Sequence, residues 1–374
     1  MVALAGSTPL EPPSTSPEQA PSDHSPRASS AAAGLRLGLT YNLKPDKVGA
    51  HEPIDRYEEL DCVETVDAIE AALRRLGHDV ERLGAGPSLF DALSRRDPAR
   101  RLDGVFNLAE GLSGRGRESQ VPALLEMLGI PNTGSDPVAL ALALDKGLAK
   151  VFAAARGIRT APFVLVGVDE APRSADLRYP LFAKPVAEGS SMGIRQSSIC
   201  RTEAELRERV EQLQRDYQQP VLVEEFLPGE EFTVGIVGNG DQAEAIGVMQ
   251  IVPREPDGDF VYSLEVKRDY LRRVRYVMSD ELLAGGLTPD ELAAIRELAL
   301  DVHRAFGCRD VSRVDIRRDR DGLPNFIEVN PLPGMNPPYS DLVILALGHG
   351  WTYDRLIGRI VDAATARWAQ RPNH

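Results

Sequence analysis

Near its start the chain alternates short apolar runs with segments of helical period, and this pattern constrains the fold more than any other feature. Residues 35–41 form an apolar run suited to a buried strand, and in 63–76 apolar side chains recur at the spacing of one helix face. Two more strand candidates, 78–83 and 102–108, and a helix around 121–128 follow. A strand–helix–strand order predicts a parallel sheet with helices on both of its faces.

The length of the chain, 374 residues, predicts two to three domains at about 150 residues each. Turn-forming residues crowd 130–137 and indicate a domain boundary there. A second helix–strand set follows, and the last third begins with strands and ends with helices near 288–306 and 351–369. The predicted parts are a tail and three folded regions, over residues 1–33, 34–135, 136–240 and 241–374.

Residues 1–33 differ in composition from the rest of the chain. They contain six prolines among many serines and alanines, and almost no bulky apolar side chains. Such a stretch buries too little surface to offset its ordering entropy, so we expect a disordered tail. It lacks the basic start and apolar run of a secretory signal, and its single arginine is too few for a transit peptide.

Charge and cysteine content exclude several classes of function. Lys and Arg number 43 against 56 Asp and Glu, and the net charge of −13 does not suit a general nucleic-acid or anionic-membrane binder. No uninterrupted apolar stretch reaches the ~18 residues of a membrane span. The three cysteines stand far apart without metal-ligand spacing, so we expect no zinc, no disulfides and a reducing, cytoplasmic compartment.

The segment 311–330 contains the most informative pattern. Two β-like runs flank Asp321-Gly322, a strong hairpin signal, and a turn centred on this pair fixes which residues face each other. Because side chains alternate along a strand, the polar residues then share one face and the apolar residues the other. The predicted polar pairs are Asp315 with Glu328 and Arg313 with Asn330, and the apolar face holds Val314, Ile316, Ile327 and Val329.

This polar face predicts a metal site. Like charges such as Asp315 and Glu328 are destabilising when they face each other directly on a sheet. A divalent cation removes that penalty, and the oxygens of Asp, Glu and Asn are ligands that Mg²⁺ accepts. The alternative is the solvated polar face of a surface hairpin, and Pro324 close behind the turn leaves the register open.

Two further segments indicate a nucleotide site. In 179–194, Lys184 follows an apolar strand and precedes a glycine–serine loop, whose N–H and hydroxyl groups suit phosphate oxygens. The Walker pattern is absent, so such a site belongs to another class, and an ordinary connecting loop is the alternative. In 221–234, glutamates surround the end of a β run and could contact adenine and ribose, or could be solvated strand ends.

In this order the segments resemble those of D-alanine–D-alanine ligases, members of the ATP-grasp superfamily. The resemblance runs from about Asp103 to the C-terminus, and more weakly from Leu35. It rests on Lys267 and on the segments EMLGIPNTGSDPVALALALDK (126–146), FAKPVAEGSSMGI (182–194), VEEFLPGEEFTV (223–234) and RVDIRRDRDGLPNFIEVNPLPGM (313–335). It implies a three-part α/β architecture: an N-terminal parallel substrate-binding domain, a central α+β lid domain and a C-terminal α+β catalytic domain.

The resemblance implies roles for individual residues. Those expected at ATP are the phosphate lysines Lys146 and Lys184, the adenine linker Glu224, Glu225, Phe226 and Leu227, and the ribose carboxylate Glu231. The expected ligands of Mg²⁺, or of Mn²⁺, are Asp315, Glu328 and Asn330. Expected at the reacting groups are Arg313, Lys267, Ser190 in the closing loop, and Gly334 as a backbone N–H donor.

The implied reaction is the ATP-dependent joining of a carboxylate to an amine. ATP phosphorylates the carboxylate, the amine attacks the acylphosphate, and ADP and phosphate are released. D-alanyl-D-alanine synthesis for the cell wall is the nearest family activity, and a homodimer is the family's implied assembly. Because an acylphosphate must be kept from water, segments 186–193 and 255–275 are the expected lids.

The chain departs from the family pattern where substrates are expected. Arg268 stands where the family has a tyrosine. This arginine suits a second substrate with an extra acidic group, or one with a hydroxyl in place of the amine. The alternative is that Arg268 lies on a solvated loop. Ser340 is the displaced counterpart of the family's carboxylate-binding serine, and Glu59, or else Glu58 or Asp61, matches the amine ligand. The expected HGxxGE stretch reads NLAEGLSGRGRES at 107–119, whose charged residues have no assigned role.

The sequence therefore predicts a carboxylate–amine ligase acting on small amino acids or related carboxylates. One alternative is a relative with an altered second substrate, such as a hydroxy acid, an acidic amino acid or an L-amino acid, in specialised metabolism. The other is a non-catalytic ATP-binding sensor. Retention of the whole phosphoryl-transfer set argues against the sensor, which has no need of it.

Overall fold

The N-terminal part of the chain is built on a parallel sheet, as predicted. The computed structural model describes residues 34–45, 47–49, 52–172, 174, 176–255 and 258–370, so the tail predicted at 1–33 lies outside the described residues. The sheet has the order β2-β1-β3, and both pairings are parallel. Its strands are β1 (Arg36–Thr40), β2 (Asp79–Arg82) and β3 (Gly104–Asn107), and the helices of this part are α1 (Val63–Arg75), α2 (Pro87–Ser94) and α3 (Gln120–Met127).

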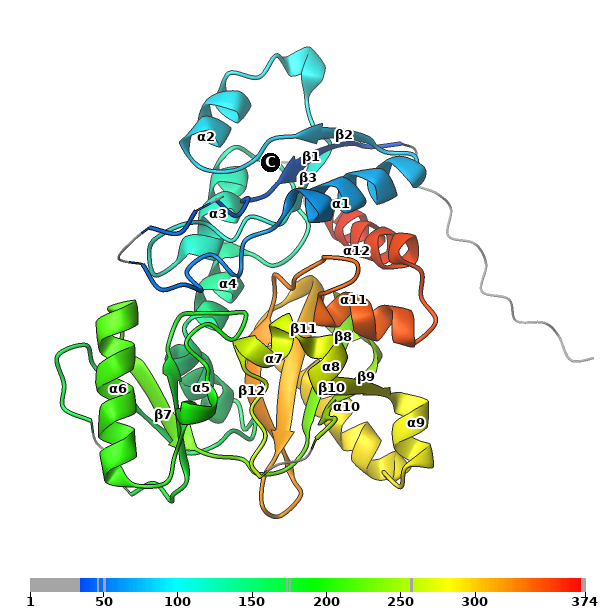
Figure 1. Cartoon of the computed structure of the whole chain (residues 1–374). Helices are drawn as coiled ribbons and strands as arrows, with labels where there is room; N and C mark the ends of the chain where they lie inside the picture. Colours follow the sequence, from blue (N-terminus) through cyan, green and yellow to red (C-terminus); the bar gives the residue numbers. More distant parts are fainter. Residues whose placement is uncertain are drawn as a thin grey trace, which may run out of the picture. The chain divides into compact units, whose positions relative to one another are not determined.

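Helices cover both faces of this sheet because successive strand residues point to opposite sides. Phe106 of β3 packs in a core with α1 and with α12 (Tyr353–Trp368) from the C-terminal end. The adjacent Val105 packs in a second core with α2 and α3. The first and last helices thus share one core, and Figure 1 shows α1 and α12 next to each other.

Helix α1 forms where the apolar spacing predicted it. Val66, Ile69 and Leu73 recur at the spacing of one helix face, and all three are buried. Glu64 lies in the first turn and two arginines lie in the last, the charge order that favours the helix dipole. The helix ends before Gly77, whose φ of +92° suits glycine at the end of a helix.

The central part of the chain is an antiparallel sheet packed on one helix. The sheet has the order β4-β7-β5-β6, and the helix α6 (Glu203–Tyr217) buries Leu206, Val210 and Leu213 against it. The strands are β4 (Phe163–Val166), β5 (Leu181–Pro185), β6 (Ile199–Cys200) and β7 (Val221–Glu225), and the preceding helices are α4 (Pro137–Leu144) and α5 (Lys146–Ala155).

The C-terminal part contains a five-stranded antiparallel sheet of order β10-β9-β8-β11-β12. The long helix α10 (Pro289–Ala305) packs on one face, and α11 (Asp341–Gly348) packs with α12 on the other. The strands are β8 (Glu231–Asn239), β9 (Glu244–Pro253), β10 (Val274–Met278), β11 (Arg309–Arg318) and β12 (Pro324–Asn330), and the short helices are α7 (Leu264–Arg268), α8 (Tyr270–Arg273) and α9 (Ser279–Ala284).

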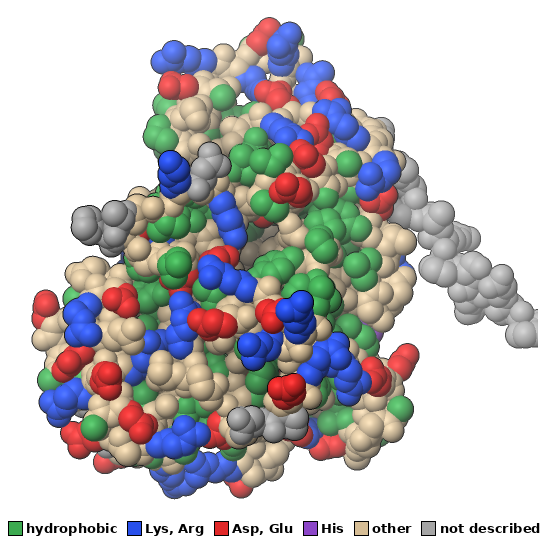
Figure 2. Space-filling model, viewed as in Figure 1, with side chains coloured by type: hydrophobic (Ala, Val, Ile, Leu, Met, Phe, Trp, Pro, Cys, Tyr) green, Lys and Arg blue, Asp and Glu red, His purple; other side chains and the backbone are tan. Residues whose placement is uncertain are grey.

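The described residues belong to one compact unit, Ala33–His374, so the boundaries near 135 and 240 stay predictions. The five-stranded sheet contains β8 before residue 240 and β9 after it. No helix in the described part of the chain is both long and apolar enough to cross a membrane. On the face seen in Figure 2, Lys and Arg side chains alternate with Asp and Glu.

Candidate active site

The hairpin formed by β11 and β12 brings the predicted metal ligands together. The two strands pair antiparallel, with Asp315 opposite Glu328 and Arg313 opposite Asn330, as predicted. Asp315 Oδ2 accepts hydrogen bonds from Arg313 Nη2 at 2.9 Å and from Asn330 Nδ2 at 3.2 Å. The hydroxyl of Thr233 on β8 donates to Asp315 Oδ1 at 2.8 Å. Three polar side chains from three neighbouring strands therefore converge on one carboxylate.

The turn itself differs from the prediction. Asp321-Gly322 is not a two-residue hairpin centre, because β11 ends at Arg318 opposite Pro324 and leaves a five-residue connection. Asp319 stabilises this connection: its Oδ1 accepts hydrogen bonds from the backbone N–H groups of Asp321 and Leu323, both at 3.0 Å. Regular pairing from Arg318 and Pro324 onward would place Asp315 one residue away from Glu328. An irregularity in the pairing after Asp315 compensates for this shift, so that Asp315 still faces Glu328.

Because of this irregularity, the prediction that Ile327 lies on the apolar face is wrong. Ile316 pairs with Phe326 instead of Ile327, and Phe326 is fully buried in the core beneath α10. Ile327 instead lines the cavity next to Glu328. A β-bulge has this effect because the extra residue rotates the following side chains relative to the sheet.

Lys146 joins the hairpin from the start of α5. Its Nζ lies 3.1 Å from Glu328 Oε2 and donates to the backbone oxygen of Glu188 at 2.6 Å. Burial alone would raise the pKa of Glu328, but Lys146 and Lys184 hold it well below its ordinary value. For Asp315, burial is the largest influence and raises the pKa, with Glu328 adding to the effect and Arg313 opposing it. The hairpin thus holds two carboxylates in different electrostatic environments.

Glu224 lies between two buried lysines. Its carboxylate is 2.6 Å from Lys150 Nζ and 2.8 Å from Lys184 Nζ. Burial opposes ionisation of Glu224, yet these two cations lower its pKa to about 2. Sequence reasoning missed Lys150, although it stands four residues after Lys146 in α5, the spacing of one helix face.

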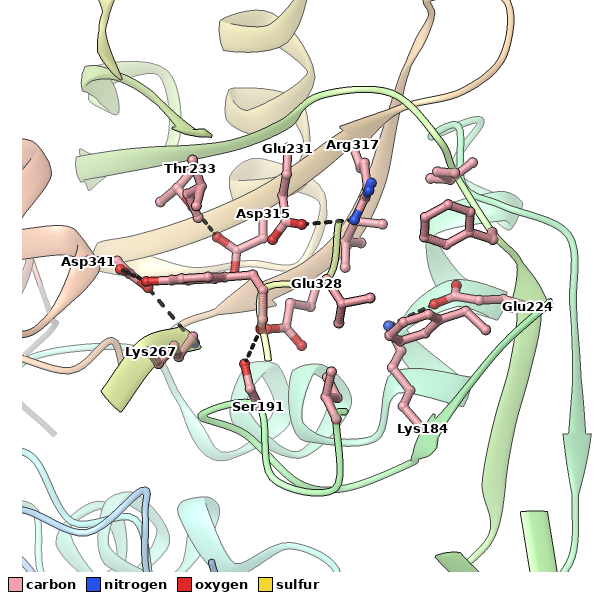
Figure 3. A pocket seen from close by; sticks show the side chains of 18 of the residues that line it. Lys184, Ser191, Glu224, Glu231, Thr233, Lys267, Asp315, Arg317, Glu328 and Asp341 are labelled. Atoms are coloured by element: carbon pink, nitrogen blue, oxygen red, sulfur yellow. Dashed lines mark hydrogen bonds and ion pairs between the residues drawn. The ribbon is translucent and has the colours of Figure 1, made fainter. Parts of the chain in front are cut away.

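Arg317 is a second residue that sequence reasoning missed. Its Nη1 lies 3.1 Å from Glu231 Oε2, and its guanidinium is 4.8 Å from the ring centre of Phe226. Figure 3 shows Arg317 pointing toward Glu231. The alternation of side chains along β11 could have predicted Arg317 as a site residue, because it is the next residue after Arg313 and Asp315 on the same face of the strand.

Two adjoining cavities contain most of the predicted site residues. The first has an apolar end formed by Phe182, Phe226, Leu227 and Val261, and a charged end at the hairpin. Its predicted site residues are Lys184, Glu224, Glu225, Phe226, Leu227, Glu231, Lys267, Asp315 and Glu328. The second cavity shares Lys267 and Glu328 with the first and adds Glu59, Lys146, Ser190, Arg313, Asn330 and Gly334.

Arg268 and Ser340 do not line either cavity. Arg268 forms an ion pair with Glu58, whose carboxylate also binds Lys44 Nζ at 3.0 Å. The Ser340 hydroxyl accepts a hydrogen bond from the backbone N–H of Asn336 at 2.9 Å and lies beside Gly334, where an added Cβ would come within 2.8 Å of it. Both residues thus have partners within the protein.

Asp341, which sequence reasoning missed, lines the first cavity in place of Ser340. Tyr262 Oη donates to Asp341 Oδ1 at 3.0 Å, and Lys267 Nζ lies 3.9 Å from Asp341 Oδ2 (Figure 3). The Lys267 ammonium also lies 4.9 Å from the ring centre of Tyr262. Position 341 carried no signal in the sequence, because an Asp in the first turn of a helix is usual.

Carboxylates of the segment 52–61 hold the predicted phosphate loop. Glu59 accepts hydrogen bonds from Arg117 and from the backbone N–H of Gly189. Asp55 accepts one from the Gly193 N–H at 3.1 Å, and the Ser191 hydroxyl donates to the backbone oxygen of Tyr262 at 3.0 Å. The two segments predicted to be lids therefore contact each other.

The donor set at the hairpin fits a hard cation. Among the described residues, no group of three or more His, Cys, Asp or Glu side chains is arranged to hold a metal ion. The predicted set is different, since Asp315 and Glu328 are joined by the amide of Asn330. Mg²⁺ typically binds one or two protein carboxylates and keeps several waters, so it does not need a third acidic ligand.

Comparison with known proteins finds a matching family model and similar sequences. A family model described as "D-ala D-ala ligase C-terminus" matches residues 152–362, more than half of the chain. The chain is 35% identical to a D-alanine--D-alanine ligase of Gluconobacter oxydans, over 80% of this chain and 92% of that protein. It is 33% identical to one of Halalkalibacterium halodurans, over 79% and 91%. An uncharacterized protein, y4sG, of Sinorhizobium fredii is 33% identical over 81% and 88%.

A solved structure shares the fold. The D-alanine--D-alanine ligase of Bacillus anthracis, complexed with ATP, aligns with a TM-score of 0.67 and 20% identity over 90% of this chain and 99% of that chain. This likeness confirms the predicted three-part ATP-grasp architecture. The family match and the curated relatives together show that this chain belongs to the D-alanine–D-alanine ligase family.

Proposed function

We propose that this chain is an ATP-dependent ligase that joins the carboxylate of one small amino acid to the amine of another, releasing ADP and phosphate. The name of the curated relatives makes D-alanine the reference substrate. One observation carries the proposal: Lys146, Lys184 and Arg313 converge with Asp315 and Glu328 on two adjoining cavities. These are the charges that phosphoryl transfer to a carboxylate requires.

The first cavity suits the nucleotide. Phe226 and Leu227 offer apolar surface to adenine, and backbone groups of Glu225–Leu227 lie beside them. Glu231, fixed by Arg317, is positioned for ribose hydroxyls at the boundary between the apolar and charged ends. We infer that the phosphates extend toward Lys184 and Lys146, because a chain of negative charges is most stable beside these buried cations.

Asp315, Glu328 and Asn330 would hold Mg²⁺ or Mn²⁺. When bound, the ion supplies charge neutralisation at the phosphate oxygens. Its ligands come from adjacent positions of one hairpin, which keeps them in place without help from a mobile loop. The other cations of the site are then available to the substrate carboxylate and to the transferred phosphoryl group.

The chemistry of the second cavity follows from what a carboxylate needs to react with an amine. A carboxylate is a poor electrophile, so it is first converted to an acylphosphate, and the amine then expels phosphate. Arg313 and the backbone N–H of Gly334 line this cavity and can stabilise the oxyanion, a contribution of roughly 3–4 kcal/mol per donor. The contact between Ser191 and Tyr262 brings the two loops together, which excludes water.

The pairing of Arg268 with Glu58 bears on the second substrate. Arg268 would favour an acidic second substrate if its charge were uncompensated, but Glu58 already provides its partner. This arrangement supports an ordinary amino acid as the nucleophile rather than a diacid. It leaves the stereochemistry of the nucleophile to experiment.

The proposal is tested by phosphate release with MgATP across D- and L-amino acids, hydroxy acids and diacids. We expect ATP consumption to depend on an amino acid and to yield ADP together with a dipeptide. Release that needs a hydroxy acid or a diacid would assign a different second substrate. ATP binding without consumption for any member would contradict the ligase proposal and favour an ATP-binding sensor.

A further inference from the structure

Beside the oxyanion donors, the second cavity carries a cluster of carboxylates that the proposed reaction does not use. Glu110 and Glu118 line this cavity together with Glu59, and Asp61 lies close enough to Glu110 to influence its charge. Glu110 follows β3, and Glu118 lies in the short 3-10 helix Arg117–Ser119. Four acidic side chains thus come from two segments that the fold brings together.

Within the described part of the chain, one member of this cluster, Glu59, forms an ion pair. Glu59 pairs with Arg117 and also accepts the Gly189 N–H. Glu118 is 8% exposed, and neither it nor Glu110 makes a side-chain hydrogen bond or ion pair within the described part of the chain. An unpaired carboxylate of this degree of burial is costly unless it is protonated or meets a cation.

The other cations that line the cavity already have carboxylate partners. Lys146 is paired with Glu328, and Arg313 with Asp315. In the proposed function Lys146 and Lys267 compensate the negative charge of the phosphates, and Arg313 compensates that of the oxyanion. In this proposal the negative charge of Glu110 and Glu118 is therefore left to be compensated by the amino acid rather than by the cations that bind the nucleotide.

Burial and mutual repulsion alter the protonation of these acids. Burial, with Glu59 adding to it, raises the pKa of Glu118 to about 8, although Arg117 and Lys146 oppose the shift. Burial and the neighbouring Glu118 and Glu59 raise the pKa of Glu110 well above its ordinary value. Without a ligand, Glu118 therefore binds a proton at neutral pH, and a cationic ligand would displace it.

We propose that Glu110 and Glu118 bind a second cationic group on the amino acid whose carboxylate is activated, so that the preferred acyl substrate is a short diamino acid. This inference rests on the proposed function and names its substrate class. One α-ammonium neutralises a single carboxylate, whereas Glu110 and Glu118 offer two beside Gly334. An amino group on a short side chain would neutralise the other through a charge-assisted hydrogen bond.

The acyl substrate can be tested alone by trapping the acylphosphate with hydroxylamine. The hydroxylamine nitrogen attacks the acyl carbon and expels phosphate, so hydroxamate formation reports which amino acid is activated. Two pairs differ in charge but little in shape: 2,4-diaminobutyrate with norvaline, and ornithine with norleucine, each as D and L forms. We expect kcat/KM to favour the cationic member of at least one pair by about tenfold or more, as for a charge-assisted hydrogen bond.

Substitutions of Glu110 and Glu118 test whether these side chains cause the preference for the cationic substrate. One of the variants Glu118→Gln and Glu110→Gln removes the partner of the side-chain ammonium, and there we expect kcat/KM for the cationic member to fall about tenfold and that for the neutral member to change less than about twofold. The other variant removes the partner of the α-ammonium and should lower kcat/KM for both members. Glu126→Gln, on the exposed face of α3, is the matched control and should keep the preference. If either Gln variant fails to fold, the comparison of the substrate pairs in the unmodified protein still decides.

A binding measurement gives a readout that does not depend on turnover. Calorimetry at pH 7 in two buffers of different ionisation enthalpy should show proton release when 2,4-diaminobutyrate binds, and less when norvaline binds. Equal hydroxamate formation from both members of each pair, or a preference for the neutral member, would overturn the diamino-acid subsite. Absence of hydroxamate with every amino acid, D-alanine included, would instead contradict the proposed function.

Discussion

Asp315 and Glu328 face each other across the β11–β12 pair, a placement that destabilises a sheet when the two carboxylates are uncompensated. Here each has its own cation. Arg313 Nη2 lies 2.9 Å from Asp315, and Lys146 Nζ lies 3.1 Å from Glu328. The protein thus tolerates an acidic pair at a position where a divalent ion can add further neutralisation.

Asp315→Asn and Glu328→Gln should each abolish Mg²⁺-dependent ATP turnover and leave the fold intact. The loss should be at least about a hundredfold, since a metal ion at a transferred phosphoryl group contributes several kcal/mol. Phosphate release measures activity, and circular dichroism checks the fold. Asp321→Asn, in the exposed hairpin connection, is the matched control and should retain activity. Unchanged turnover in either ligand variant would refute the metal assignment.

Lys150→Met should destabilise the protein through Glu224. Lys150 is fully buried, and its removal leaves Glu224 with Lys184 as its remaining cation. We expect a loss of about 2–3 kcal/mol in the free energy of unfolding, somewhat below the cost of leaving a buried charge with no partner. Urea unfolding measures this loss, and the exposed Arg156→Met at the end of α5 should change stability by less than about 0.5 kcal/mol. Equal stabilities of the two variants would contradict this role.

Arg317→Met should raise the KM for ATP about tenfold and change kcat by less than about twofold. Its contacts to Glu231 and Phe226 lie at the proposed adenine–ribose end, away from the reacting groups, so they should contribute equally to ground and transition states. Arg317→Lys should recover part of the affinity, because it restores the charge without the planar fork. Arg320→Met, exposed in the hairpin connection, provides the control. A lowered kcat with unchanged KM would place the nucleotide elsewhere.

His303 should make stability depend on pH in the acid range. It is fully buried beside the Ser312 hydroxyl, and burial lowers its pKa from 6.5 to about 4. Because the folded pKa is the lower one, this contribution is complete above pH 6.5 and is lost as pH falls from 6.5 to about 4. The loss should amount to about 3 kcal/mol.

The comparison with His303→Asn isolates this term, since the carboxylates of the protein titrate in both variants. Urea midpoints at several pH values between 4 and 7 should fall more steeply for the unmodified protein than for His303→Asn. Parallel curves for the two proteins would show that His303 does not carry the dependence.

The β11–β12 hairpin shows which features of the site could be predicted from the sequence. Alternation of polar and apolar residues predicted that Arg313 and Asp315 share a face and identified their partners correctly. The predicted turn centre was wrong, and the irregularity after Asp315 was not predicted. Their effects on the pairing cancel, so Asp315 still faces Glu328. Whether Phe326 or Ile327 enters the core depends on the space beneath α10, which only the packed structure determines.

Other parts of the site could not be predicted because their partners are remote in the sequence. Lys150 resembles any lysine on a helix until β7 brings Glu224 within 2.6 Å of its ammonium group. Asp341 likewise acquires its role from Tyr262 and Lys267, which lie on a different segment. Motif order singled out Lys146 and Lys184, which line the two cavities, but it did not predict the pairings that the fold creates.

Isotope transfer shows whether the carboxylate is activated by phosphorylation. The best amino-acid substrate is labelled with ¹⁸O in its carboxylate, and turnover is run with unlabelled ATP. An acylphosphate pathway moves one carboxylate oxygen onto the phosphoryl group, so the released phosphate should carry one ¹⁸O per dipeptide formed. Phosphate without ¹⁸O, in reactions that still form dipeptide, would rule out an acylphosphate.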